Sequence, residues 1–115
     1  MARLITRKWI ALDAVSMASN QTSSSTDLAF KDKGRAYAVW SGATNLTGTL
    51  DVQISNDNVT WRTITAVTIP LDSASGSHEI VLPSMDFNYL RFKYTAGTEN
   101  SGSLTIEFNA AIEGA

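Results

Sequence analysis

The chain has 115 residues and no cysteine, so it fits a single domain and excludes a disulfide framework, a thiolate metal site and a thiol nucleophile. Nine basic and eleven acidic residues give a net charge of -2, too balanced for nucleic acid or an acidic membrane to be the main partner. No apolar run approaches the roughly 20 residues of a transmembrane helix. No signal-peptide core follows Arg3, Arg7 and Lys8, so we expect a soluble protein made in the cytoplasm.

The N-terminal residues 1–17 are compatible with two structures. Read as a helix, one side collects Leu4, Ile5, Lys8, Trp9, Leu12 and Val15. Read as a strand, one face takes Ile10, Leu12 and Ala14 and the other takes Trp9, Ala11 and Asp13. We favour an extended arm over residues 1–12 that leads into a strand, with one folded domain over residues 13–115. Residues 19–26 carry no apolar side chain and predict an exposed loop, or an ordered loop held against a neighbour.

Two short strands are expected next. Residues 27–30 predict a strand, and residues 31–34 a turn in which Gly34 is free to adopt a positive φ. In the second strand, residues 35–41, one face carries Tyr37 and Val39, and the other carries Ala36, Ala38 and Trp40. Because both faces are apolar, we expect both to be covered, with another chain as a candidate for one of the covers.

The strongest structural signal is a hairpin over residues 46–61 and beyond. Leu50, Val52 and Ile54 alternate with polar residues, which predicts a half-buried antiparallel strand. Residues 55–58 are short polar side chains that favour a turn, after which the chain returns through Val59 and Trp61. Ile64 breaks the parity of the return strand, so either a β-bulge intervenes or its face is also partly buried. Residues 79–82 predict a further short strand.

The last third predicts two strands, residues 87–95 and 103–112, separated by a Gly-containing loop, and we expect these two strands to pair. Their expected inward faces are Leu90, Phe92 and Tyr94, and Leu104, Ile106, Phe108, Ala110 and Ile112. About eight short strands with turn signals every 8 to 12 residues predict an all-β fold, an antiparallel β-sandwich with an N-terminal arm. The pattern leaves a jelly roll and an immunoglobulin-like Greek key as alternatives.

No set of residues predicts catalysis, a cofactor or a metal ion. His78 is the only histidine, so neither a nucleophile-base triad nor an ordinary zinc site can be built around it. No spacing of carboxylates singles out a general acid and base pair. Residues 55–61 resemble a shortened form of the Asp-box turn of sialidases and other propellers, in which the box is structural. We therefore expect a protein that is not an enzyme.

Aromatic and basic side chains give the remaining candidates. The three tryptophans and Tyr37, Tyr89 and Tyr94 are expected in the core or at interfaces, with a sugar-stacking platform as the alternative. Trp61 itself is expected to plug the core or cover a sheet. Arg91 and Lys93 project with Tyr89 from one strand face, which we expect to be solvated or in contact with another subunit.

Several patterns together resemble small β-sandwich virion proteins of tailed bacteriophages. They are the Ser-rich loop, the strand ending in Val39 and Trp40, and the runs GTLDVQISNDNVTW (48–61), YLRFKYTA (89–96) and SGSLTI (101–106). The resemblance spans residues 20–112 and implies a capsid decoration (cement) protein made in the host cytoplasm and located on the capsid surface. It implies the major capsid protein and copies of itself as partners, possibly in a trimer. Alternatives are a tail or head-fibre component for host attachment, and a carbohydrate-binding module.

On this hypothesis, copies associate through a sandwich face such as the one that bears Trp40, while residues 1–12 reach an adjacent subunit or the shell. Several small contacts then add through multivalency. The candidate subunit or capsid contacts are Arg3, Leu4, Ile5, Arg7, Lys8, Trp9, Trp40, Tyr89, Arg91 and Lys93.

Overall fold

The computed structural model describes residues 3–27, 33–44, 48–68, 74–82, 87–98 and 101–114. Within these ranges the side chains of residues 3–7, 33, 65–68 and 111–114 are left undescribed. The strands are β1 (Arg3–Ser16), β2 (Gln21–Thr22), β3 (Thr26–Asp27), β4 (Lys33–Ser41), β5 (Thr49–Ser55), β6 (Arg62–Thr68), β7 (Gly76–Val81), β8 (Tyr89–Thr95) and β9 (Ser103–Gly114). The expected turn at residues 31–32 and most of the expected strand at 27–30 lie outside the described residues.

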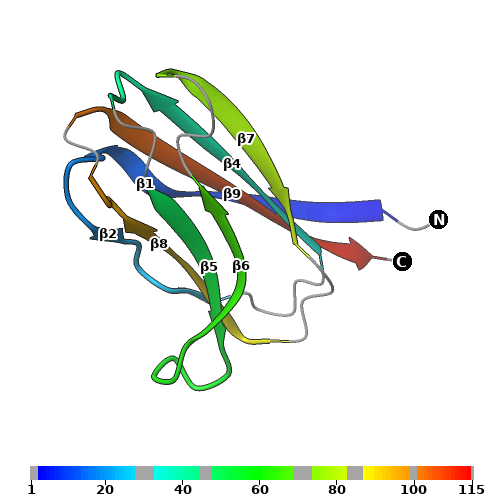
Figure 1. Ribbon diagram of the computed structural model, residues 1–115. Helices are drawn as coiled ribbons and strands as arrows, with labels where there is room; N and C mark the ends of the chain where they lie inside the picture. The colour runs from blue at the N-terminus through cyan, green and yellow to red at the C-terminus, as the bar shows by residue number, and fades with distance from the viewer. Residues whose placement is uncertain are drawn as a thin grey trace.

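The strands form two antiparallel sheets that face each other (Figure 1). Sheet A has the order β1-β9-β4-β7, and sheet B has the order β2-β8-β5-β6, with β3 also paired to β8. The predicted all-β sandwich is therefore confirmed. The molecule is elongated, with principal extents of 47 × 31 × 19 Å, and both termini lie at the same end of sheet A (Figure 1).

The pairing pattern identifies the sandwich as a jelly roll. Because β2 and β3 both pair with β8, they share one position at the edge of sheet B. The remaining pairs are nested, since β5 pairs with β6, β4 with β7, the β2/β3 edge with β8, and β1 with β9. A long hairpin folded over on itself gives this order. In an immunoglobulin sandwich the first strand pairs with the second, so that alternative is wrong.

The core lies between the sheets, and the predicted inward faces fill it. Leu50 and Val52 of β5 and the inward residues of β8 and β9 are buried, and Ile54 packs against them. The Phe92 ring of sheet B meets the Phe108 ring of sheet A edge-on at 5.9 Å, and the Trp9 ring stacks on Phe108 at 5.4 Å. The side chain of Ile112 lies outside the described residues. The alternation of residues therefore predicted the core face correctly.

The expected pairing of the last two strands is wrong. β8 lies in sheet B beside β5, whereas β9 lies in sheet A between β1 and β4. The loop after β8 crosses from one sheet to the other, so the two strands face each other through their buried residues and share no ladder. A short Gly-containing loop permits a hairpin and a crossover equally well, and only the global order of strands decides between them.

The N-terminal segment is a strand, and the helical alternative is wrong. β1 pairs continuously with β9 from Arg3↔Gly114 to Ile10↔Glu107 and then shows register shifts between Ile10 and Leu12 and between Leu12 and Val15. At these bulges the inward residues change from Trp9 and Ala11 to Leu12 and then to Val15, which strict alternation does not predict. β1 crosses residue 12 without a break, so residues 3–12 belong to sheet A and do not form a detached arm.

The Ser-rich segment at 19–26 is ordered and part of sheet B. β2 and β3 pair with β8, and Ser23 between them is buried, so the expected loop is wrong for these residues. The expected exposure is confirmed for most of the segment, namely Ser19, Asn20, Thr22, Ser24 and Ser25. Asn20 also bonds the end of β8, because its side-chain oxygen accepts from the Ala96 N–H at 3.0 Å. Short polar side chains thus accept hydrogen bonds from the backbone of β8 and of Ala96 at this edge.

The central hairpin and its bulge are present. β5 and β6 pair with a register shift opposite Val52 and Gln53, because Gln53 pairs with Thr63 while Val52 pairs with Thr65. Ile64 is the residue in excess and packs against the core. The β-bulge is therefore present and Ile64 is partly buried, as the two explanations for its parity require.

Candidate functional site

The first candidate contacts, Arg3, Leu4, Ile5 and Arg7, lie on β1 with their backbones paired to β9. Their side chains lie outside the described residues. Lys8 follows them on the outer face of sheet A, where its Nζ lies 3.4 Å from Oε1 of Glu107 on β9. This pair is exposed and contributes no more than about 1 kcal/mol. β1 is the edge strand of sheet A, and no strand in the described ranges pairs with its other side.

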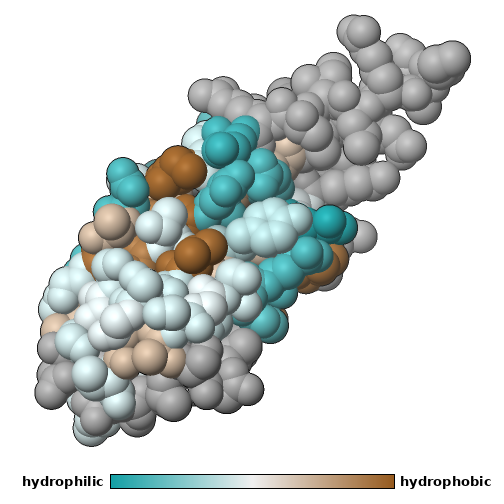
Figure 2. Space-filling model, turned by 90° about the horizontal axis from the view of Figure 1, so that it is seen from above, coloured by the Kyte–Doolittle hydropathy of each residue, from teal (hydrophilic) through white to brown (hydrophobic). Residues whose placement is uncertain are grey.

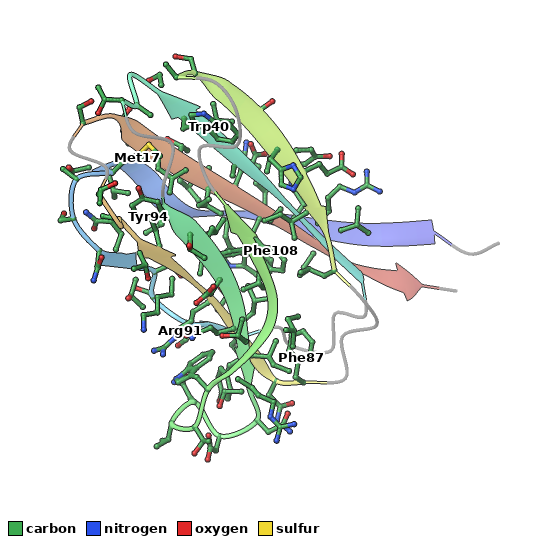
Figure 3. The ribbon with its side chains drawn as sticks, in the orientation of Figure 1. Met17, Trp40, Phe87, Arg91, Tyr94 and Phe108 are labelled. Carbon is green, nitrogen blue, oxygen red and sulfur yellow. The ribbon has the colours of Figure 1, made fainter. Side chains whose placement is uncertain are left out.

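Two of the candidate tryptophans belong to the interior. Trp40 is only 3% exposed and points into the core with Ala36 and Ala38 (Figure 3). Trp9 is half-buried and stacks on Phe108. Trp40 therefore cannot touch a neighbouring subunit while the sandwich stays folded, and the expected contact through this residue is wrong. The strand places it inward because Tyr37 and Val39 take the outer positions.

The outer face of sheet A is the opposite side of the same strand. The exposed apolar residues on it are Ile10 of β1, Val39 of β4 and Val81 of β7, with exposed fractions of 49%, 51% and 64%. Figure 2, which views the molecule from the β7 side of Figure 1, shows separate hydrophobic side chains among hydrophilic ones. Val39 is half exposed, so the described residues do not supply the expected second cover of this face.

Charged side chains divide these apolar residues. Arg35 Nε lies 3.3 Å from Oε1 of Glu79 on the neighbouring β7. A hydrogen bond with Tyr37 and the charge of Glu79 raise the pKa of Arg35. The outer face of sheet A thus carries ion pairs with isolated β-branched side chains between them. Protein–protein contacts that are not permanent have a similar mixture of polar and apolar area.

On the outer face of sheet B, Arg91 organises the candidate residues of β8. Arg91 Nε donates to Oε1 of Gln53 on β5 at 2.8 Å, and its guanidinium carbon lies 4.3 Å from the centre of a Trp61 ring. Tyr89 and Lys93 lie two residues to either side on the same face and are half-buried. The structure therefore brings Tyr89, Arg91 and Lys93 together, as the alternation predicted.

Sequence reasoning did not predict Gln53 and Trp61 as the partners of Arg91. The signal was present for Gln53, which falls on the predicted outward face of β5 and pairs with Arg91 in the ladder. Trp61 precedes β6, and its side depends on the loop, which the parity of the strand does not fix. Trp61 was expected either to plug the core or to cover a sheet, and it covers the outer face of sheet B beside Arg91.

The loop between β5 and β6 is held by two side chains. Oδ1 of Asp57 accepts from the Ser55 hydroxyl at 2.9 Å and from the N–H groups of Val59 and Thr60 at 2.9 and 2.8 Å. The Ser55 oxygen in turn accepts from the N–H of Asn58 at 2.9 Å, and Asn58 adopts a positive φ of 62°. The hydrogen bonds from Thr60, Val59 and Ser55 lower the pKa of Asp57 from 3.8 to about 2. The carboxylate is therefore charged at neutral pH.

A hollow of about 310 Å³ lies beneath this loop. Its lining residues are Ile54, Ser55, Asn56, Asp57, Thr60, Trp61, Arg62 and Phe87. Phe87 is buried at 7% exposure, while Asn56, Asp57, Thr60 and Arg62 are exposed. The hollow thus combines an apolar floor and an aromatic side chain with a polar rim, the composition found in ligand sites. In the described ranges no group of three or more His, Asp or Glu side chains is placed to hold a metal ion.

No known family model matches this chain, and no curated protein matches its sequence. Its fold is similar to that of the PBSX exported protein XepA, with 19% identity and a TM-score of 0.67 over 95% of this chain and 38% of that one. It is also similar to the SPBc2 prophage-derived protein YomS, with 7% identity and a TM-score of 0.63 over 96% of both chains. A third similar structure is the infectious bursal disease virus VP2 subviral particle, with 13% identity and a TM-score of 0.58 over 97% of this chain and 33% of that one. The chain thus spans about a third of the XepA and VP2 chains and almost all of YomS.

Proposed function

We propose that the chain is a structural protein of a phage virion, a capsid decoration protein that binds the major capsid protein and copies of itself at the head surface. The observation that carries this proposal is the likeness of its fold, over at least 95% of the chain, to two phage-derived proteins and to VP2. The argument from fold to role is one of analogy. The surface of the molecule supports it with two places suited to contacts.

The first place is the edge of β1 from Arg3 to Ile10. This stretch has regular register with β9, and an edge strand presents backbone N–H and C=O groups that pair with a strand of another chain. Ile10 adds an exposed apolar side chain at its end. Pairing between two β1 edges, or between β1 and a strand of the shell, would continue sheet A across the contact. The N-terminal residues would then make the contact as a strand of sheet A.

The second place is the strip of Tyr89, Arg91 and Lys93 on sheet B. Trp61 and Gln53 hold Arg91, so less side-chain entropy is lost when Arg91 meets a carboxylate of the shell. Because the two places lie on different sheets, one copy can touch two neighbours at once. Each further contact then forms at high effective concentration, and the weak contacts add.

The location is tested on purified virions of the phage or prophage that encodes the chain. Gold-labelled antibody against the protein is expected to mark the heads of intact particles in electron micrographs. Label confined to tails would assign the protein to the tail or to fibres, and unlabelled particles that also lack the protein by mass spectrometry would refute the virion role.

The β1 edge is tested with Ile10→Lys, which places a charge on the edge strand. Heads that lack the protein are mixed with the variant, and bound copies are counted after sedimentation. We expect bound copies to fall at least about tenfold, which corresponds to about 1.4 kcal/mol. The matched control is Val59→Lys, because Val59 is 78% exposed on the β5–β6 loop and should bind normally. Equal binding by both variants would refute the role of the edge.

Light scattering of the free protein tests self-association, and we expect a closed oligomer that Ile10→Lys weakens.

A further inference from the structure

The assembly contacts proposed above use Trp61 only as the support of Arg91 and leave the hollow beneath the β5–β6 loop without a role. It holds about 310 Å³, at the lower end of the size range of small-molecule sites, and it is partly open to solvent. Ile54 and Phe87 give it an apolar floor that continues the core of the sandwich. A ligand that enters it must therefore combine an apolar surface with polar groups.

The aromatic wall of the hollow is held in place before any ligand arrives. The Arg91 guanidinium carbon lies 4.3 Å from the centre of the Trp61 ring, and Gln53 fixes Arg91 through the hydrogen bond at 2.8 Å. A ring fixed in this way loses little freedom on binding, which removes part of the entropic cost of forming a complex. A flat indole ring buries a large apolar area and suits a ligand with a flat C–H face.

The polar rim of the hollow is held as firmly. Asp57 uses one oxygen, Oδ1, for its bonds to Ser55, Val59 and Thr60, and its pKa of about 2 keeps the carboxylate charged. A carboxylate has lone pairs on both oxygens, so Oδ2 retains acceptor capacity toward a ligand hydroxyl. Hydrogen bonds from hydroxyl groups to a charged carboxylate are about twice as strong as those between neutral groups. Asn56 and Thr60 add donors and acceptors of the neutral kind.

We propose that this hollow binds a neutral pyranose residue of a glycan, with the C–H face of the sugar on Trp61 and its hydroxyls on Asp57 and the neighbouring polar side chains. A pyranose offers one apolar face and a ring of hydroxyl donors, which matches an aromatic wall beside an anionic acceptor. The rim carries one charge of each sign, Asp57 and Arg62, and this balance matches a neutral sugar. The site uses no residue of the β1 edge, but it shares Trp61 with the support of Arg91 in the strip on sheet B.

The site is tested by NMR with the isotope-labelled protein and four probes, glucose, galactose, mannose and N-acetylglucosamine, each added up to about 50 mM. The indole N–H signals of Trp9, Trp40 and Trp61 are assigned from single Trp→Phe variants. We expect the Trp61 signal, together with backbone signals of the β5–β6 loop, to move saturably with at least one sugar, while the Trp9 and Trp40 signals stay still. Binding in the millimolar range is expected for a ligand of this size.

Variants then distinguish sugar binding in the hollow from a nonspecific effect of the sugar on the protein. Trp61→Ala should weaken binding at least about tenfold, and Trp61→Phe should retain part of it. Asp57→Asn keeps an oxygen for the loop but loses the charge, so it should weaken binding while the loop signals stay in place. Val59→Ala, on the same loop but outside the lining, should bind as the unchanged protein does.

Three outcomes would overturn the proposal. One is the absence of saturable shifts at Trp61 with all four sugars, and another is equal shifts at all three tryptophans. The third is a loss of head binding by Asp57→Asn without any response to sugars, which would assign the hollow to a protein contact. A sugar response in a protein that does not bind heads would uphold this site and refute the assembly role.

Discussion

The hydroxyl of Ser23 is expected to matter more for stability than any other serine of the 19–26 segment. Ser23 is 7% exposed and sits between β2 and β3 at the edge of sheet B. Its N–H donates to the Phe92 carbonyl at 2.8 Å, and its Oγ accepts from the Phe92 N–H at 2.8 Å. The side-chain oxygen therefore takes the place that a backbone carbonyl has in a regular ladder.

Ser23→Ala removes that acceptor and leaves the Phe92 N–H buried without a partner. An unsatisfied buried donor costs about 1–3 kcal/mol of the free energy of unfolding. For a domain of this length, each kcal/mol lowers the melting temperature by roughly 4 °C, so we expect a fall of roughly 4–12 °C. Urea unfolding followed by tryptophan fluorescence gives the free energy, and amide exchange of Phe92 reports the lost bond directly.

The matched control is Ser24→Ala, because Ser24 is the exposed neighbour and contributes only its backbone carbonyl to the Ser23 hydroxyl. We expect this variant to stay within about 0.5 kcal/mol of the unchanged protein. If Ser23→Ala behaved like Ser24→Ala and the Phe92 amide stayed protected, the account of this edge would be refuted.

Three further predictions concern the core and the central loop. Phe108→Ala should cost about 3–5 kcal/mol in urea unfolding, because the ring is fully buried between Trp9 and Phe92; a loss below about 1 kcal/mol would contradict this packing. Tyr94→Phe should cost about 1–3 kcal/mol, because the Tyr94 hydroxyl donates to the buried Met17 carbonyl at 2.9 Å, and unchanged stability would show that water replaces the bond. Asp57 has a folded-state pKa of about 2, below its ordinary 3.8, so the stability it adds is present above pH 4 and is lost as the pH falls toward 2. Urea midpoints measured between pH 5 and 2 should therefore fall more for the unchanged protein than for Asp57→Asn, and parallel curves would contradict the assignment.

The faces of individual strands could be predicted from the sequence, because burial follows a period of two wherever a strand is regular. Leu50, Val52 and Phe92 point inward as alternation requires, and Arg91 points outward. The turn at Ser55 and Asp57 was equally predictable, since short polar side chains bond their own backbone in few arrangements.

The partners of strands could not be predicted in the same way. The loop after β8 has the residues of a hairpin turn, but it crosses between sheets because β9 is needed between β1 and β4. Ser23 is a polar residue in a polar segment, and only the neighbouring Phe92 backbone makes its burial favourable. These outcomes depend on contacts between residues far apart in the sequence, which local patterns do not contain.

In the candidate site, too, the face of a residue could be predicted from the sequence, but its partners could not. Arg91 was predicted on an exposed face, but the residues that hold it come from β5 and from the loop before β6. Trp40 and Trp61 both lie in or beside strands and differ in position because Trp40 follows a regular alternation while Trp61 precedes a bulged strand. The residue type therefore predicted which interactions a side chain can make, and the strand register decided on which face of the sheet the side chain lies.

The two halves of β1 differ in regularity, and this difference is the reason why we propose the assembly contact at one end of sheet A. Beyond Ile10 the strand has two register shifts, and Ala14 adopts a positive φ of 50°. The Ala14 N–H bonds to Oγ1 of Thr105 at 3.0 Å, so this half of the edge is irregular and its donor is already satisfied. Bulges of this kind block pairing with other chains. From Arg3 to Ile10 the edge keeps a regular register with β9, without a bulge, and for this reason we propose the contact on this half of the strand.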